Sequence, residues 1–280
     1  MATSKNVGDA GSLLPQAGSY HQVQGLVRGL EVLCALNRRR SGTASAVELS
    51  EATGLNRSTV KRLLETLRTS GFVHPLADGR NYTLTFRVQQ LSDGFDDESG
   101  LCAVARPLLQ NLTEKVLWPS DLVSLEGDRL VIRHSTHSFS PLSFHAGTVG
   151  DNFPLLPTSA GRAYLAFCST EERELLLEML RSRDDAQGQL ARDERRVRLL
   201  LQATRERGYG VNDGDWIGQR AFGGLAAPIR DRSRVLACVN IIFSRRAMTL
   251  AHAMRRYGDE LLATARQIER QFKDSRRGAR

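Results

Sequence analysis

The stretch TGLNRSTVKRLL, residues 53–64, decides the fold of the N-terminal part of this chain. Gly54 can adopt the left-handed backbone conformation that ends a helix, and Asn56 is a favourable cap for the helix that follows. That helix is expected from Arg57 to Ser70, with Gly71 ending it. Its apolar residues recur at the spacing of one buried side of a helix: Val60, Leu63, Leu64 and Leu67. Two helices joined by a tight turn are therefore predicted here.

The residues before this stretch predict two more helical features. Ser45 and Glu48 have the spacing of a capping box, in which the hydroxyl and the carboxylate each accept a hydrogen bond from a backbone amide. They predict a short helix that begins after Ser45 and stops at Gly54. A first helix is expected from about Gln24, with Leu26, Leu30, Leu33 and Asn37 on one side and Val27 and Cys34 beside it.

The residues after the third helix complete the pattern. Residues 72–75 and 81–84 are short extended runs on either side of Asp78-Gly79, which predicts a β-hairpin. The order helix, helix, turn, helix, hairpin is that of a winged helix-turn-helix. We therefore assign residues 21–88 to a DNA-binding domain and residues 1–20, which lack periodicity, to a disordered arm.

The polar side of the third helix is the expected DNA-reading surface. We expect Ser58, Lys61 and Arg62 to reach base edges or nearby phosphates, and Arg57 and Thr59 to contact phosphates at the helix start. Arg80, at the hairpin tip, would reach the backbone or the minor groove. Residues 20–88 contain ten Lys and Arg against five Asp and Glu, a net +5 of the +8 carried by the whole chain.

The second part of the chain mixes strands and helices. Residues 89–118 are expected to be a linker and a connecting helix, Leu101 to Val116, and residues 119–272 a separate domain. Strands are expected near 121–126, 130–135, 142–145, 225–229 and 235–243, and helices near 158–168, 170–180, 193–207 and 250–272, followed by a basic tail, 273–280. This order predicts an α+β fold with helices covering a sheet.

Several sequence segments resemble the IclR family of bacterial regulators across about residues 22–272. They are 27–30 and 48–50, the turn and third helix at 53–64, and the stretches 157–167, 208–210 and 226–229. The resemblance implies that the second domain is a GAF-like α/β effector-binding domain. It also implies a double-stranded DNA operator, a small-molecule effector, and assembly as a homodimer or a tetramer.

The resemblance carries an effector site onto this sequence. It places Ser159, Ala160 and Gly161 at a loop entering a helix, where free amides also suit a carboxylate on physical grounds. It places Asn240 and Ile242 on a pocket-lining strand, where the family often has small hydroxylated residues. Asp215 is expected to receive a ligand hydroxyl and Trp216 to stack on a ring, although a turn residue and a core residue would look the same.

Four further segments resemble family members that activate phenylpropionate breakdown genes: 90–95, 118–121, 135–139 and 142–145. This closer resemblance implies an aromatic-acid effector and an activating role in aromatic hydrocarbon catabolism. Neither expectation follows from composition or periodicity.

Other classes of function find less support. An enzyme acting on a small aromatic acid, with an accessory basic domain, is the alternative, but the chain has no nucleophile elbow, phosphate-binding loop or zinc-protease motif. A nucleoid-type protein would not need a large second domain. Because His134 and His137 would point to opposite faces of a strand, we expect that these two and His145 form no metal site, and we expect no cofactor. Four widely spaced cysteines and no apolar run of membrane length fit a cytoplasmic protein.

Overall fold

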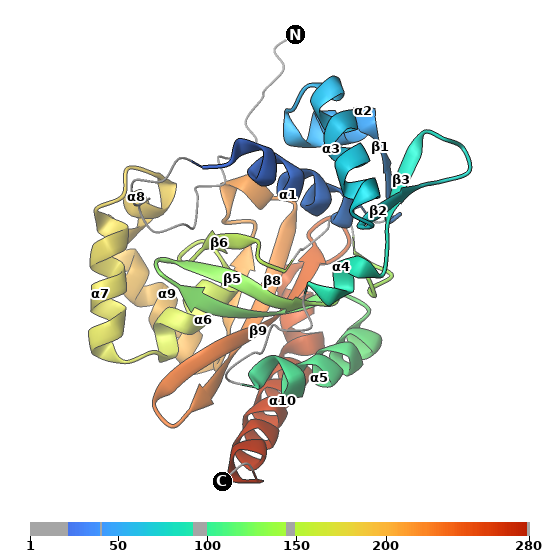
Figure 1. The fold of residues 1–280 in the computed structure, drawn as a ribbon. Coiled ribbons are helices and arrows are strands. Elements are labelled where there is room, and N and C mark those ends of the chain that lie inside the picture. The colour runs from blue at the N-terminus through green and yellow to red at the C-terminus, as the bar shows by residue number, and fades with distance from the viewer. Residues whose placement is uncertain (1–21, 40, 92–99, 144–148, 279–280) are drawn as a thin grey trace. The chain divides into compact units, whose positions relative to one another are not determined.

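The computed structural model describes residues 22–39, 41–91, 100–143 and 149–278 (Figure 1). The chain divides into two compact units, Met1–Gln90 and Leu91–Arg280, called here the N-terminal and the C-terminal unit. The proposed arm at 1–20 lies outside the described residues. Within the described ranges, no helix is both long and apolar enough to cross a membrane.

The N-terminal unit has the helix and hairpin order expected of a winged helix-turn-helix. Its elements are α1 (Gln24–Asn37), β1 (Thr43–Ser45), α2 (Ala46–Thr53), α3 (Arg57–Thr69), β2 (Val73–Pro75), β3 (Asn81–Leu84) and α4 (Arg87–Gln90). The hairpin strands β2 and β3 pair antiparallel, and β1 adds a third strand on the other side of β3. The strand β1 was not predicted, because three residues show no measurable alternation.

The second helix is held at both ends as its sequence predicts. The Ser45 hydroxyl accepts a hydrogen bond from the Glu48 amide at 3.3 Å, and the Glu48 carboxylate accepts one from the Ser45 amide at 2.8 Å. Gly54 ends the helix with φ at +71°. Asn56 does precede α3, but its side chain makes no capping hydrogen bond, so its expected capping role is wrong in that respect.

The core of the N-terminal unit shows that the predicted buried side of the first helix is partly wrong. Val60 and Leu64 of α3 are fully buried, as expected. In α1, however, Leu26 and Leu30 are 62% and 51% exposed, and Val32, Leu33 and Leu36 form the buried side. The apolar residues of this helix occur on more than one side, so periodicity alone did not select the side that packs.

Replacement of Ser45 by alanine is expected to lower the stability of the N-terminal unit by about 1 kcal/mol, because an orphan helix amide loses its acceptor. The Ser45 backbone amide is the main cause that lowers the pKa of Glu48, and the Ser45 hydroxyl, which donates to the same carboxylate at 2.8 Å, is the second cause and the one that S45A removes. Glu48 therefore stabilises the folded state above its ordinary pKa, and this contribution is lost as the pH falls through the lowered value. Thermal unfolding of wild type and S45A should differ most near neutral pH and less in acid; a constant difference would contradict the coupling.

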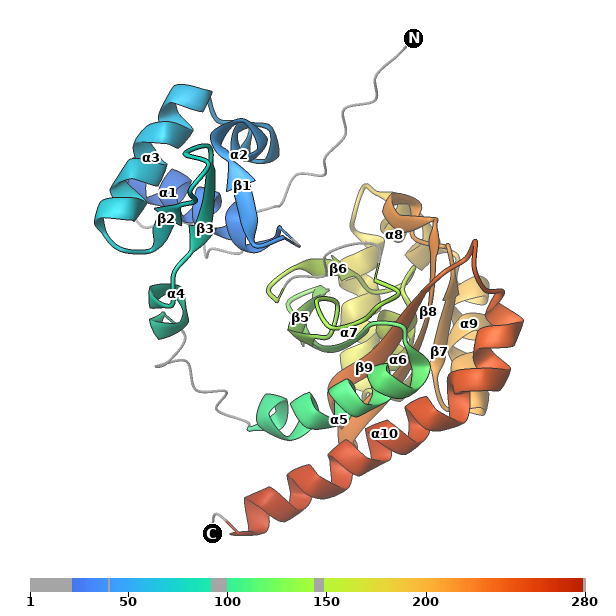
Figure 2. The ribbon, with the colours of Figure 1, turned by 90° about the vertical axis from the view of Figure 1, so that its right-hand side faces the viewer.

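The C-terminal unit is a six-stranded antiparallel sheet with helices on both faces (Figure 2). Its helices are α5 (Leu101–Val116), α6 (Ser159–Phe167), α7 (Thr170–Arg181), α8 (Ala186–Arg192), α9 (Glu194–Arg207), the 3-10 turn η1 (Ile217–Gln219) and α10 (Leu250–Gly278). Its strands are β4 (Ser120–Glu126), β5 (Arg129–Ser135), β6 (Asn152–Pro154), β7 (Gly210–Asp213), β8 (Phe222–Asp231) and β9 (Arg234–Ser244), in the order β6-β5-β4-β9-β8-β7.

Each face of this sheet has its own apolar core. Leu122, Val239 and Ile241 pack with α5 and α10 on one face, while Val123 and Cys238 pack with α6, α7 and α9 on the other. Because side chains alternate along a strand, every second residue of β4 and β9 faces α6. The alternation therefore decides which strand residues can belong to an effector site.

Some predicted boundaries in this unit are wrong. The final helix continues to Gly278, so the expected basic tail is helical through most of its length. Leu142 and Ser143 lie in a turn, not in a strand, and the rest of that predicted strand, including His145, lies outside the described residues. The short elements β6 and α8 were not predicted.

Candidate functional site

The expected DNA-reading residues lie together on the outer side of α3. Arg57, Ser58, Lys61 and Arg62 are exposed, whereas Thr59 is partly buried. Neither Lys61 nor Arg62 has an ion-pair partner among the described residues. Their charges are therefore available to phosphates or base edges, and the buried Val60 and Leu64 fix the rotation of the helix that presents them.

Arg68, on the same helix, differs from these cations. Its guanidinium donates to both carboxylate oxygens of Glu65, with Nε at 3.1 Å and 3.0 Å from them. This hydrogen bonding is the main cause that lowers the pKa of Glu65. The charge of Arg68 is balanced within the helix, so the available positive charge of α3 is concentrated at its N-terminal half.

The hairpin tip holds Arg80 in an ordered turn. The Asp78 carboxylate accepts hydrogen bonds from the backbone amides of Arg80 and Asn81 at 2.9 Å and 3.0 Å, and these bonds lower the pKa of Asp78. The Arg80 side chain is exposed at this tip. The structure thus presents Arg80 from the wing and the remaining cations from α3 of the same unit.

The expected effector residues of α6 and β9 share one face of the sheet. The Cys238 thiol lies 3.5 Å from the Ala160 carbonyl oxygen, which places α6 over the face of Cys238, Asn240 and Ile242. Ser159 lies beside β8, because a Cβ built on Gly224 would be 2.8 Å from its hydroxyl. Ser159, Ala160 and Asn240 are buried, and Ile242 is partly exposed.

The start of α6 is packed without spare room. The Thr158 hydroxyl caps it by accepting from the Gly161 amide at 3.1 Å. A Cβ added to Gly161 would lie 2.0 Å from the Leu155 carbonyl oxygen. The nearest atoms all belong to the backbone of Leu155 and cannot rotate away, so only glycine fits at this position. Gly161 therefore sets the position of Ser159 and Ala160 and offers no side-chain contact to a ligand.

Asp121 is a fully buried acidic residue that the sequence reasoning did not single out. It pairs across the sheet with Asn240, whose side-chain oxygen accepts a hydrogen bond from the Asp121 amide at 2.8 Å. Asp121 is 0% exposed, and its carboxylate accepts no hydrogen bond from any described residue. The local sequence gives little signal for this, because Asp121 stands near the start of a strand that also contains Ser120, Ser124 and Glu126.

His137, considered above only as a metal ligand, lies beside Asp121. Its Nε2 is 3.7 Å from Asp121 Oδ1, and its Nδ1 is 2.8 Å from the Ser143 hydroxyl. His134 instead pairs with Leu122, on the opposite face, and burial is the main cause that lowers its pKa. The ranges that the structure describes contain no group of His, Cys, Asp and Glu arranged to hold a metal ion.

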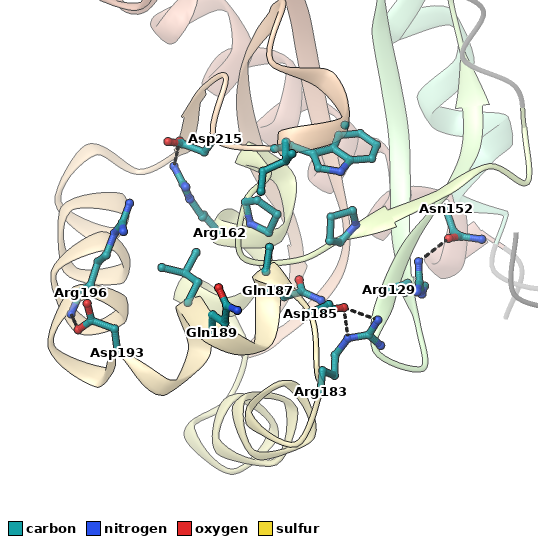
Figure 3. A pocket seen from close by; sticks show the side chains of 17 residues that line it. Arg129, Asn152, Arg162, Arg183, Asp185, Gln187, Gln189, Asp193, Arg196 and Asp215 are labelled. Carbon is teal, nitrogen blue, oxygen red and sulfur yellow. Dashed lines mark hydrogen bonds and ion pairs between the residues drawn. The ribbon is translucent and has the colours of Figure 1, made fainter. Parts of the chain in front are cut away.

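Asp215 lies at a different place, a pocket of about 570 Å³ near β6, α8 and η1 (Figure 3). Its carboxylate pairs with the buried Arg162 guanidinium at 2.9 Å, and Arg162 also donates to the carbonyl oxygens of Leu156 and Val211. Burial is the main cause that lowers the pKa of Arg162, and Asp215 opposes it. The pocket is lined by Asp215 and Trp216, but by none of the other expected effector residues.

The wall of this pocket contains charged residues that the sequence reasoning did not select. Figure 3 shows Arg129, Arg183 and Arg196 around it, together with Asp185 and Asp193. Most of this charge is balanced internally, since Arg183 pairs with both Asp185 and Asp128. No local sequence pattern predicts this wall, because its residues come from β5, α8, α9 and the segments between them.

Comparison with known proteins identifies related chains. The family described as "Bacterial transcriptional regulator IclR C-terminal" matches residues 97–270, and "IclR helix-turn-helix domain" matches residues 25–76. The "Pca regulon regulatory protein" of Pseudomonas putida is 28% identical over 87% of this chain and 82% of its own length. The "Transcriptional repressor IclR" of Escherichia coli K12 is 29% identical over 76% of this chain and 77% of its own length.

A solved structure shows the same fold. An IclR homologue from Microbacterium hydrocarbonoxydans, complexed with 4-hydroxybenzoate, superposes with a TM-score of 0.59 at 22% identity, covering 89% of this chain and 99% of that chain. The matches to both units, together with the winged helix-turn-helix and the helix-covered sheet, establish the family. This chain belongs to the IclR family of bacterial transcriptional regulators.

Proposed function

We propose that this IclR-type regulator controls genes of aromatic-acid catabolism and responds to a phenylpropionate-type acid in the cytoplasm. That it is a ligand-responsive DNA-binding regulator follows from its family. The proposed DNA site rests on one observation: three exposed cations of α3 have no ion-pair partner among the described residues. They are Arg57, Lys61 and Arg62. Ser58, Thr59 and Arg80 complete the proposed contacts.

The proposed effector site lies on the α6 face of the sheet. The first-turn amides of α6, at Ser159 and Ala160, suit a ligand carboxylate, because they carry the positive end of the helix dipole. Asn240 and Ile242 would form the wall beside the ring. The likeness to a homologue complexed with 4-hydroxybenzoate supports an aromatic acid as the effector. The resemblance to activators of 3-(3-hydroxyphenyl)propionate breakdown supports an effector whose carboxylate is separated from the ring as in phenylpropionate, and it supports an activating role.

Asp215 fits this site less well than expected from the sequence. Its carboxylate is occupied by Arg162, and it lines the separate pocket with Trp216. We therefore keep Asp215 as a competing hydroxyl acceptor and give the main role to the α6 face. Assembly as a homodimer or tetramer, which would pair two recognition helices on one operator, is part of the same proposal.

The test combines effector and operator binding. Addition of 3-(3-hydroxyphenyl)propionate should raise the Tm of the full chain and change its affinity for an operator selected from genomic fragments. Light scattering of the free and operator-bound protein checks the assembly. A full chain that binds its operator but ignores every phenylpropionate- and benzoate-type acid would contradict the aromatic-acid proposal and leave the family assignment intact.

A further inference from the structure

The buried carboxylate of Asp121 accepts no hydrogen bond within the described part of the chain. It is 0% exposed, and both oxygens lack a hydrogen-bond donor among the described residues. An ionised carboxylate without donors is among the most costly groups to bury, and such groups in native proteins call for a specific explanation. The residue stands in the middle of the sheet, between β5 and β9, where an apolar side chain would pack at no such cost.

The groups around Asp121 leave its acceptors unused. His137 Nε2 lies 3.7 Å from Oδ1, which is too far for a hydrogen bond. The Asn240 side chain faces the backbone amide of Asp121, where its oxygen accepts a hydrogen bond. This bond holds the Asn240 side chain against the backbone of β4 and leaves the Asp121 carboxylate oxygens for another donor.

The same face is accessible on both sides of Asp121. Ser135, directly across from it on β5, and Ile242, two residues from Asn240 on β9, are both partly exposed. The start of α6 lies over β8, two strands away from β4, because Ser159 lies beside Gly224. Two strand spacings correspond to about 10 Å, so the amides of α6 and the Asp121 carboxylate can hold opposite ends of a small elongated molecule.

We propose that Asp121 accepts a hydrogen bond from a hydroxyl group on the ring of the effector and is a specificity-determining residue of this regulator. The proposal rests on the proposed function, since it assigns the far end of the same ligand. The carboxylate end would bind at Ser159 and Ala160, and the phenolic hydroxyl would supply the donor that Asp121 lacks. Acids without that hydroxyl would leave the buried carboxylate unpaired and therefore bind more weakly.

A purely structural role makes a different prediction. If Asp121 only formed an ion pair with protonated His137, its neutral variant would lose stability and would not change ligand preference. If it is kept for a ligand, the isosteric neutral variant D121N should raise the Tm of the ligand-free protein, because it removes an unpaired buried charge. A structural role thus predicts a lower Tm and an unchanged ligand preference in D121N, whereas a ligand-binding role predicts a higher Tm and a changed preference.

The experiment measures the Kd of 3-phenylpropionate and 3-(3-hydroxyphenyl)propionate by titration calorimetry on the full chain. Wild type should prefer the hydroxylated acid by about 10- to 100-fold, the range for one hydrogen bond to a charged acceptor. In D121N and in D121A this ratio should fall at least fivefold, while the Kd of 3-phenylpropionate stays within about threefold. The variant D259N makes the same change at an exposed position of α10 and should keep the wild-type ratio of the two Kd values.

Three results would overturn the assignment. An unchanged ratio in both Asp121 variants would show that another group reads the hydroxyl, and loss of the ratio in D215N alone would move that role to Asp215. Wild-type protein that binds neither acid would remove the proposed effector class and this role together. Because the first two results leave acid binding intact, they are distinguishable from a failure of the proposed function.

Discussion

The double variant K61A/R62A should bind the operator at least about 30-fold more weakly than wild type. A direct contact from a charged side chain in the major groove is worth about 1–3 kcal/mol, so the loss of two such contacts costs about 2 kcal/mol or more. Both side chains are exposed on α3, and no described residue pairs with either charge. Within the described ranges, removing these two charges therefore breaks no ion pair that the folded protein makes.

The measurement is a fluorescence-anisotropy titration of a selected operator at several salt concentrations. Each lost phosphate contact should reduce the slope of log K against log salt by about 0.9, whereas lost base contacts should reduce discrimination between operator and random DNA. The control R266A/R270A removes the same charge from exposed positions of α10. Equal affinity of K61A/R62A and this control would disprove the assignment of the α3 surface.

The variant G161A should unfold the C-terminal unit several degrees below wild type. The new Cβ would lie 2.0 Å from the Leu155 carbonyl oxygen and 2.3 Å from its Cα, and backbone atoms cannot rotate away as a side-chain end can. Overpacking of this kind costs about 3 kcal/mol or more, which corresponds to a fall in Tm of about 6–12 °C for a unit of this size. Effector binding should weaken as well, because Ser159 and Ala160 move with the start of α6.

The matched control is G29A in the interior of α1. A Cβ at Gly29 would meet only a Leu63 side-chain methyl, at 3.9 Å, which is an ordinary contact. Because alanine is the better helix former, G29A should keep or raise stability by up to about 1 kcal/mol. Calorimetric scans of both variants test the pair, and a wild-type Tm for G161A would mean that the approach between α6 and Leu155 is not tight in solution.

The elements that sequence reasoning found are those with local signals. The capping box at Ser45 and Glu48, the turn at Gly54 and the apolar repeat of α3 each involve residues within about four positions of one another. Such signals act in the chain before any tertiary contact forms, and the structure confirms them. The short elements β1, β6 and α8 carry no comparable signal and were missed.

The errors arose where the outcome depended on distant partners. The buried side of α1 was misassigned at Leu26 and Leu30, because the choice among its apolar sides depends on what α3 and the small sheet present. Likewise, Asp215 looked available until the structure paired it with Arg162, a residue 53 positions earlier in the chain. The residues around Asp215 contain no pattern that predicts an ion pair with Arg162.

By itself, the sequence determined a recognition helix with cations on one side and leucines on the other. Residues three or four positions apart lie on the same side of a helix, so their spacing in the sequence gives the side directly. Only the tertiary structure decided that Asp121, Asn240 and Ser159, which lie far apart in the chain, share one face of the sheet. The reason is that strand register comes from long-range backbone pairing and from the packing of α6. A one-residue shift of β4 would turn Asp121 to the opposite face.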